Sequence, residues 1–213
     1  MGKSVYLIAF VATLAIFSVA FFSVKAFEDA RFYQVNEELN QIAFESQLDK
    51  VYSELSASDS NYYCYFIEDN IANISDTLSK LELRLKSYKE SMVSQEYTVA
   101  KKNYLINNLL LYSRVKKAVA DCNLDIKPIL YFYAEDNSCD VECGAIANQL
   151  DQIKQLCPGA GVFAFPYNWP DYKFTSILEK QYNITKAGTI VINDKKFDSL
   201  QTNETLLNEL RCK

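Results

Sequence analysis

The sequence predicts an α/β protein in three parts: a membrane-spanning helix, an α-helical hairpin that serves as a stalk, and a C-terminal α/β domain. Three observations predict this organisation. Residues 4–24 carry no charge, apolar residues recur at helical spacing over 67–92, and predicted strands alternate with helices from residue 125 onward. Such alternation indicates a mostly parallel sheet with helical crossovers.

The composition of the chain excludes several classes of function. The 213 residues carry a net charge of −5 and include no histidine. Nucleic-acid binding needs a basic surface, so the charge argues against a nucleic-acid partner. The absence of histidine excludes Ser-His-Asp and Cys-His catalysis and every histidine-containing metal site. No glycine-rich phosphate loop is present, and we predict neither a metal site nor a cofactor.

The run 4–24, "SVYLIAFVATLAIFSVAFFSV", is long enough to cross a membrane, because about 20 apolar residues span a bilayer. We interpret it as a single-pass transmembrane anchor. The alternative is a cleaved signal peptide, since "VKA" at 24–26 fits a cleavage site. The apolar region of a signal peptide is usually only about 7–15 residues long, however.

The cysteines favour an oxidising compartment for the residues that follow the anchor. They are Cys64, Cys122, Cys139, Cys143, Cys157 and Cys212. An even number of cysteines behind an export-type segment is typical of exported proteins. Glycosylation sequons at Asn73, Asn183 and Asn203 also favour an exported location, but they carry little weight, because one or two sequons would arise by chance in a chain rich in Asn and Ser. Positive charges flank the anchor almost evenly, so the cysteines decide the orientation: the amino terminus inside, the remainder outside the cytoplasm.

Residues 26–122 are predicted to form the helical stalk. Within it, Ile67, Ile71, Ile74, Leu78, Leu81, Leu85, Tyr88 and Met92 alternate steps of four and three. This heptad pattern, typical of coiled coils, predicts a long helix over 67–92, and a short connection leads to a second helix over 97–119. Helices joined in this way pack antiparallel. The hairpin acts as a spacer or, if an apolar face remains uncovered, as a homodimer contact.

The hairpin geometry also predicts one disulfide. Cys64 lies just before the first hairpin helix, and Cys122 lies just after the second. Antiparallel packing brings these two ends together. We therefore expect a bond between Cys64 and Cys122 that closes the base of the hairpin. A second staple between Cys157 and Cys212, each at a helix end, is weakly indicated.

The C-terminal part, 125–213, resembles a known family. Strands are predicted at 127–134, 161–167, 189–192 and 197–200, and helices at 139–155, 172–182 and 204–211. The run "PILYFYAEDNSCDVEC" resembles the first strand and active-site turn of thioredoxin-like proteins, and "ILEKQYNITKAGTIVINDKKF" is similar to their second half. The resemblance extends to membrane-anchored, archaeal-type members with a helical spacer. It implies a thioredoxin-like domain and thiol–disulfide exchange.

Two departures from the family pattern concern the expected active site. Three residues, rather than two, separate Cys139 from Cys143. The family also places a cis-proline before a hairpin strand, facing the cysteines, and the residue at that position here is Gly188, within the predicted substrate loop Ala187–Gly188–Thr189. A glycine fits this backbone but lacks the rigid cis bond, so we expect a trans or loose Ala187–Gly188 peptide.

The chemistry of the cysteine pair leaves three interpretations open. As an exchange site, Cys139 would attack from the helix N-terminus, which favours a thiolate, and Cys143 would resolve one turn later. The neighbouring carboxylates of Glu135, Asp136, Asp140 and Glu142 oppose a thiolate, with no local cation between Lys127 and Lys154. The alternatives are a structural disulfide and, with least support, a metal site.

We therefore predict a membrane-anchored protein that exchanges disulfides with exported proteins through Cys139 and Cys143. The alternative is a non-catalytic binding or assembly module displayed on the stalk. An aromatic segment at 165–172, "FPYNWPDY", is either a loop packed over the sheet edge or the lip of a peptide-binding surface. An exposed Cys139 at a helix start favours the exchanger, and a buried or differently bonded Cys139 favours the module.

Overall fold

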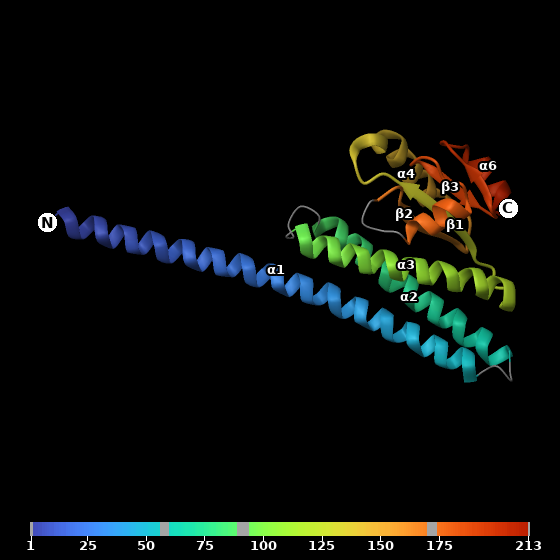
Figure 1. Cartoon of the computed structure of the whole chain (residues 1–213), viewed down its shortest axis with the longest axis horizontal. Coiled ribbons are helices and arrows are strands. Elements are labelled where there is room, and N and C mark those ends of the chain that lie inside the picture. The colour runs from blue at the N-terminus through green and yellow to red at the C-terminus, as the bar shows by residue number, and fades with distance from the viewer. Residues whose placement is uncertain (1, 56–59, 89–93, 170–173, 213) are drawn as a thin grey trace.

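The computed structural model describes residues 2–55, 60–88, 94–169 and 174–212. Its first element, α1 (Gly2–Leu55), is one uninterrupted helix. The first part of α1 projects alone, as Figure 1 shows, and its apolar side chains are exposed. In the described part of the chain, one helix is long and apolar enough to cross a membrane; it lies within Tyr6–Phe44, and its 18-residue apolar window has a mean hydropathy of 2.5.

The second half of α1 packs against α2 (Ser60–Tyr88) and α3 (Ser94–Cys122). Val35, Leu39 and Ile42 of α1 are buried in this contact. All the heptad positions of α2 from Ile67 to Leu85 are buried as well; the last expected position, Met92, lies outside the described residues. The helical stalk predicted over 26–122 is therefore a three-helix arrangement, in which the second half of α1 packs on the hairpin of α2 and α3. Homodimer formation and a coiled-coil geometry stay predictions.

A four-stranded sheet follows the helices. Strand β1 (Lys127–Tyr133) pairs in parallel with β2 (Ala160–Pro166) and antiparallel with β3 (Thr189–Ile192), which pairs antiparallel with β4 (Lys195–Phe197). The strand order is β2-β1-β3-β4. Asn193 and Asp194, with φ of 50° and 63°, form the two-residue turn between β3 and β4.

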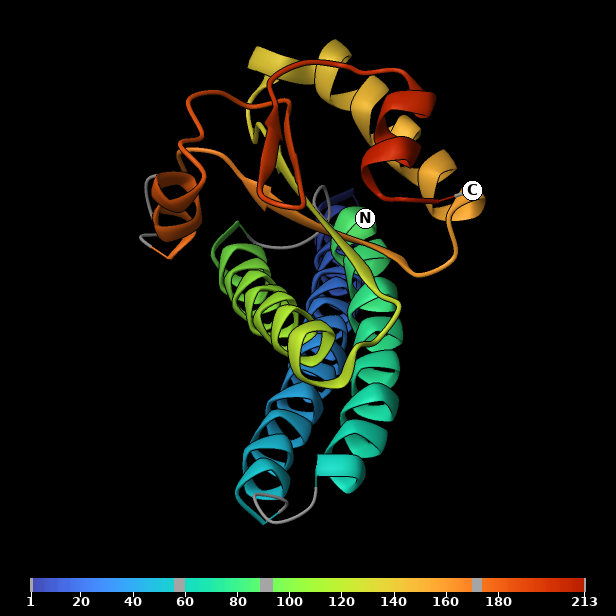
Figure 2. The same ribbon diagram turned by 90° about the vertical axis from the view of Figure 1, so that its right-hand side faces the viewer.

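Helices cover both faces of the sheet (Figures 1 and 2). The short 3₁₀ helix η2 (Asn137–Cys139) leads into α4 (Asp140–Leu156). One face packs on α4 and on α6 (Asn203–Glu209), and the other packs on α3 together with α5 (Thr175–Gln181). The side chains of Phe132 and Phe165 on this second face are fully buried in the same core as the three-helix arrangement.

The predicted α/β, thioredoxin-like fold class is wrong for this chain. The structure is dominated by helix: α1, α2 and α3 alone contain more than half of the residues, and the only sheet among the described residues is small and mixed. The predicted mostly parallel sheet is wrong as well. The helix α5 has seven residues, about 10 Å at 1.5 Å per residue. The chain does not return along β1 after this helix: Thr189 pairs with Phe132, so β3 starts at the end where β1 and β2 finish and runs antiparallel to β1.

Candidate functional site

Cys139 and Cys143 are bonded across the first turn of α4, with their Cα atoms 5.2 Å apart. Asp136 caps the short helix that precedes them, because its carboxylate accepts a hydrogen bond from the Ser138 N–H at 3.0 Å. This turn ends at Cys139, the N-cap residue of α4. Tyr131, from β1, donates a 2.8 Å hydrogen bond to the carbonyl of Cys143 and so fixes the turn onto the sheet.

The two sulfurs differ in surroundings but not in exposure. In an exchange site the attacking Cys139 should be more accessible than Cys143, yet each cysteine is 9% exposed. Cys139 lies at the helix start and is bonded to its predicted partner, which suits an exchanger, but it is buried, which by the criterion stated from the sequence favours the binding module. Its side chain lines a cleft of about 610 Å³, whereas Cys143 lines a second cleft of about 540 Å³. The two clefts adjoin each other, because Ala134, Glu135 and Asp136 line both.

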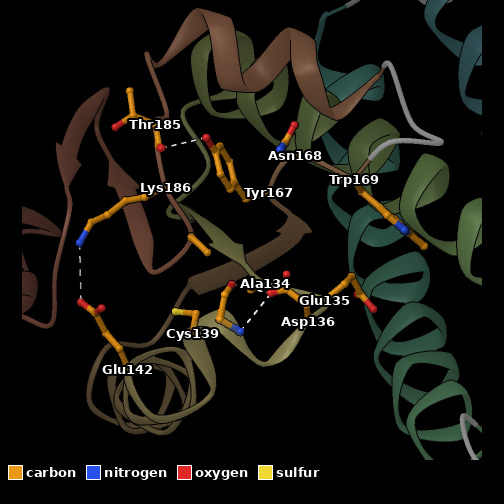
Figure 3. Close-up of a pocket in the computed structure, with 12 residues that line it drawn as sticks. Ala134, Glu135, Asp136, Cys139, Glu142, Tyr167, Asn168, Trp169, Thr185 and Lys186 are labelled. Carbon is orange, nitrogen blue, oxygen red and sulfur yellow. Dashed lines mark hydrogen bonds and ion pairs between the residues drawn. The ribbon is translucent and has the colours of Figure 1, made fainter.

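Figure 3 shows the cleft beside Cys139. The turn before α4 and the first turn of α4 form one wall, and the segments after β2 and after α5 form the other. The lining residues are Ala134, Glu135, Asp136, Ser138, Cys139, Glu142, Tyr167, Asn168, Trp169, Thr185, Lys186 and Ala187. Cys139 lies across the opening from Lys186 and Tyr167 in this view. A peptide entering the cleft would meet the Cys139 sulfur between these walls.

The predicted substrate loop does face the cysteines. Gly188 has a φ of +77°, and a Cβ added there would lie 3.4 Å from the Cys139 sulfur. Its N–H donates to the Phe132 carbonyl at 2.8 Å. A proline would lose both features, since it has no N–H and fixes φ near −65°. Ala187 lines the cleft, and no cis peptide occurs among the described residues, so the Ala187–Gly188 bond is trans.

Thr189, the third residue of this loop, does not reach the cleft. It is fully buried at the start of β3. Its hydroxyl donates to the Lys186 carbonyl at 2.9 Å and lies 3.3 Å from a carboxylate oxygen of Asp198. Thr189 thus fixes the loop in place and is not positioned to contact a client.

Two lysines that sequence analysis missed partly neutralise the acidic turn. Lys101 of α3 forms an ion pair with Glu135, and Lys186 lies 3.9 Å from Glu142. Asp136 instead accepts hydrogen bonds from the side chain and backbone of Ser138, and these bonds lower its pKa. The expectation that four uncompensated carboxylates surround the thiols is therefore wrong. The local sequence contained no signal for either lysine, because each comes from a distant element.

The aromatic segment after β2 contributes to both packing and the cleft. Tyr167 donates a 2.8 Å hydrogen bond to the Thr185 carbonyl, and Trp169 packs against the core shared with the helices. The ammonium group of Lys101 lies 5.3 Å from the centre of the Trp169 ring. Both residues also line the Cys139 cleft. The last residues of "FPYNWPDY" lie outside the described part of the chain.

The cleft beside Cys143 lies between the helices and the α4 side of β1. Its walls include Tyr97 and Tyr104 of α3 and Tyr131 and Tyr133 of β1. Burial, and then the Glu135 charge, raise the pKa of Tyr97 to about 12. Burial, and then the Glu142 charge, raise that of Tyr131 to about 12. These phenols therefore remain neutral hydrogen-bonding groups at physiological pH.

The other cysteines are paired away from the clefts. Cys64 is bonded to Cys122, with Cα atoms 5.3 Å apart, at the base of the α2–α3 pair as the hairpin geometry predicted. Cys157, after α4, is bonded to Cys212, after α6, with Cα atoms 5.5 Å apart. Within the described ranges, no cluster of three or more Cys, Asp or Glu side chains is arranged to hold a metal ion.

Comparisons with protein families, with curated proteins and with solved structures find no match to this chain. Membership of the thioredoxin-like family therefore stays a prediction from the sequence.

Proposed function

We propose that the protein is a membrane-anchored thiol–disulfide exchanger that acts on exported proteins through Cys139 and Cys143. The observation that carries the proposal is the bond across the first turn of α4, whose Cys139 sulfur lines an open cleft. A helix N-terminus favours a thiolate at its first residues, which suits Cys139 as the sulfur that reacts with a client. The local ion pairs of Glu135 and Glu142 reduce the opposing negative charge.

The exchange reaction is balanced within the pair. A client thiolate attacks the Cys139 sulfur, the Cys139–Cys143 bond breaks, and Cys143 leaves with the electron pair as a thiolate. A second client thiolate then attacks the client sulfur of the mixed disulfide and releases Cys139 as a thiolate. The client is oxidised to a disulfide, and the pair is reduced to a dithiol. In the reverse direction, Cys139 attacks a client disulfide and Cys143 resolves the mixed disulfide.

The proposal includes the orientation of the chain. The helix that is long enough to cross a membrane anchors the protein, and the residues after it lie outside the cytoplasm. Three cysteine pairs at bonding distance support this orientation, because disulfides persist in oxidising compartments and are rare in the cytosol.

A trapping experiment tests the proposed exchange. In full-length Cys143→Ser, the Cys139 thiolate attacks a client peptide that contains a disulfide and releases one peptide thiolate, and without Cys143 the resulting mixed disulfide is not resolved and should accumulate. Cys139→Ser should accumulate none. The matched control is Cys157→Ser with Cys212→Ser, which removes a bonded pair outside the clefts and should leave the exchange intact. If Cys143→Ser forms no adduct while its Cys139 thiol is shown to be free, the protein is not an exchanger.

The low exposure of both sulfurs supports a second candidate function. At 9% exposure, Cys139 and Cys143 have the burial of a structural disulfide. In that case the C-terminal part is a non-catalytic binding or assembly module held by the helices, and its surface rather than its sulfur chemistry is functional. The same trapping experiment separates the two, because a structural pair yields no adduct.

A further inference from the structure

The cleft beside Cys139 has an excess of negative charge. Among the described residues, its lining contains the carboxylates of Glu135, Asp136 and Glu142 and one cation, Lys186. Glu135 and Glu142 each have a lysine partner. Asp136 has none, since no cation in the described ranges forms an ion pair with it. The unbalanced charge of the cleft is therefore concentrated on Asp136, which lies on the turn that ends at Cys139.

The structure keeps the charge of Asp136 in place. Its carboxylate accepts hydrogen bonds from the N–H and the hydroxyl of Ser138. These bonds hold the carboxylate on the turn and favour its ionised form. Asp136 is exposed, so an incoming side chain can reach it. Figure 3 shows Asp136 and Cys139 on the same wall of the cleft.

The opposite wall is aromatic. Tyr167 and Trp169 line the cleft, and Trp169 already has one ammonium group, that of Lys101, 5.3 Å from its ring centre. Aromatic faces attract cations and also pack against the methylene stems of long basic side chains. Because Lys101 already lies at the Trp169 ring, a lysine or arginine in the cleft would pack its stem against Tyr167 and direct its charge toward the fixed carboxylate.

We propose that this cleft selects client segments in which a lysine or arginine lies within one or two positions of the reacting cysteine. The inference rests on the proposed exchange function and specifies its substrate class. The basic residue docks against Asp136 while the client thiolate attacks the Cys139 sulfur and displaces Cys143 as a thiolate. Electrostatic complementarity of this kind acts chiefly on the rate of encounter, and salt screens it.

The experiment uses full-length, oxidised protein in detergent micelles and three peptides with one cysteine each. The peptides are identical except that the cysteine is flanked by Lys, Gln or Glu. After an alkylating quench, mass spectrometry follows the opening of the Cys139–Cys143 bond. Each rate is divided by the rate of the same peptide with hydroxyethyl disulfide, a neutral reagent, so that differences in intrinsic thiol reactivity cancel.

We expect the normalised rate of the Lys peptide to exceed that of the Gln peptide by about threefold to tenfold, with the Glu peptide slowest. The differences should collapse near 0.5 M salt, where the Debye length is about 4 Å. Asp136→Asn should remove most of the preference. Glu68→Gln, which removes an exposed carboxylate of α2 outside both clefts, should retain it.

The outcomes distinguish the inference from the function on which it rests. If no peptide opens the bond while all three react with hydroxyethyl disulfide, the exchange function itself is wrong. If all three open it at equal normalised rates, or if Asp136→Asn and Glu68→Gln behave alike, exchange stands and the selection of basic clients is wrong. A preference for the Lys peptide that depends on salt and on Asp136 supports the proposal.

Discussion

Replacing Gly188 with alanine should destabilise the protein, although the change adds only one methyl group. Gly188 has a φ of +77°, and placing a residue with a Cβ in a left-handed conformation costs about 1–2 kcal/mol. The new Cβ would lie 3.4 Å from the Cys139 sulfur and 3.6 Å from a methyl group of Ile146, which are ordinary contact distances. The backbone therefore accounts for most of the expected cost.

Gly144 provides a matched control for the same substitution. It lies in the first turns of α4, and a Cβ added there would meet nothing within 4 Å. Glycine inside a helix is less stable than alanine by about 0.5–1 kcal/mol, so Gly144→Ala should stabilise the protein by that amount. The free energies of unfolding of the two variants should thus differ by about 1.5–3 kcal/mol, because Gly188→Ala is less stable and Gly144→Ala more stable than the natural protein.

Urea unfolding in detergent micelles measures both variants. The chain has a single tryptophan, Trp169, whose fluorescence reports on the sheet and its loops. A midpoint for Gly188→Ala at or above that of the natural protein would refute the assigned backbone conformation. The added methyl group also fills space beside the Cys139 sulfur. Gly188→Ala should therefore slow the opening of the Cys139–Cys143 bond by client thiols.

Four further outcomes are expected. Cys64→Ser with Cys122→Ser should lower the free energy of unfolding by about 4 kcal/mol, because the bond spans a separation of 58 residues, and urea titration checks this. The pKa of Tyr131 is raised from 10.0 to about 12. The contribution of its neutral phenol to stability should therefore be fully present below pH 10 and be lost as the pH rises toward 12. Unfolding measured at increasing alkaline pH checks this. In microsomes, Asn183, exposed in a turn with a φ of 51°, should carry a glycan if the chain is oriented as proposed, and an unmodified Asn183 would count against that orientation. A fragment 123–213 should aggregate or bind hydrophobic dyes, because it lacks α3; a soluble, cooperatively folded fragment would contradict this.

Sequence analysis located the elements whose signals are local. The heptad positions of α2 are buried because a helix with apolar residues every three or four positions has one face to cover, whatever covers it. The Cys64–Cys122 disulfide was predicted from the antiparallel packing of the two hairpin helices alone. Asn193 and Asp194 form the turn between the strands predicted at 189–192 and 197–200, and these residue types adopt positive φ at low cost.

The packing partners could not be predicted in the same way. The sequence predicted a helical stalk over 26–122, but no local pattern showed that Val35, Leu39 and Ile42 of α1 would pack on α2 and α3. The direction of β3 relative to β1 depended on the path of the chain after α5, and no local pattern at 172–182 shows that path. The charge balance of the cleft depended on the lysines of α3 and of the loop before β3, and no local pattern connects these with Cys139.

The helices are part of the candidate site and do not act as a simple spacer. Tyr112 of α3 packs edge-on against Phe163 of β2, with ring centres 5.3 Å apart, and its hydroxyl lies 2.9 Å from that of Tyr182 after α5. Asn108 donates to the Ala164 carbonyl at 3.2 Å. Through these contacts α3 completes the sheet core, and through Lys101 it holds Glu135 at the mouth of the Cys139 cleft. Because one helix serves both purposes, any movement of α3 relative to the sheet changes the charge and the shape of the cleft together.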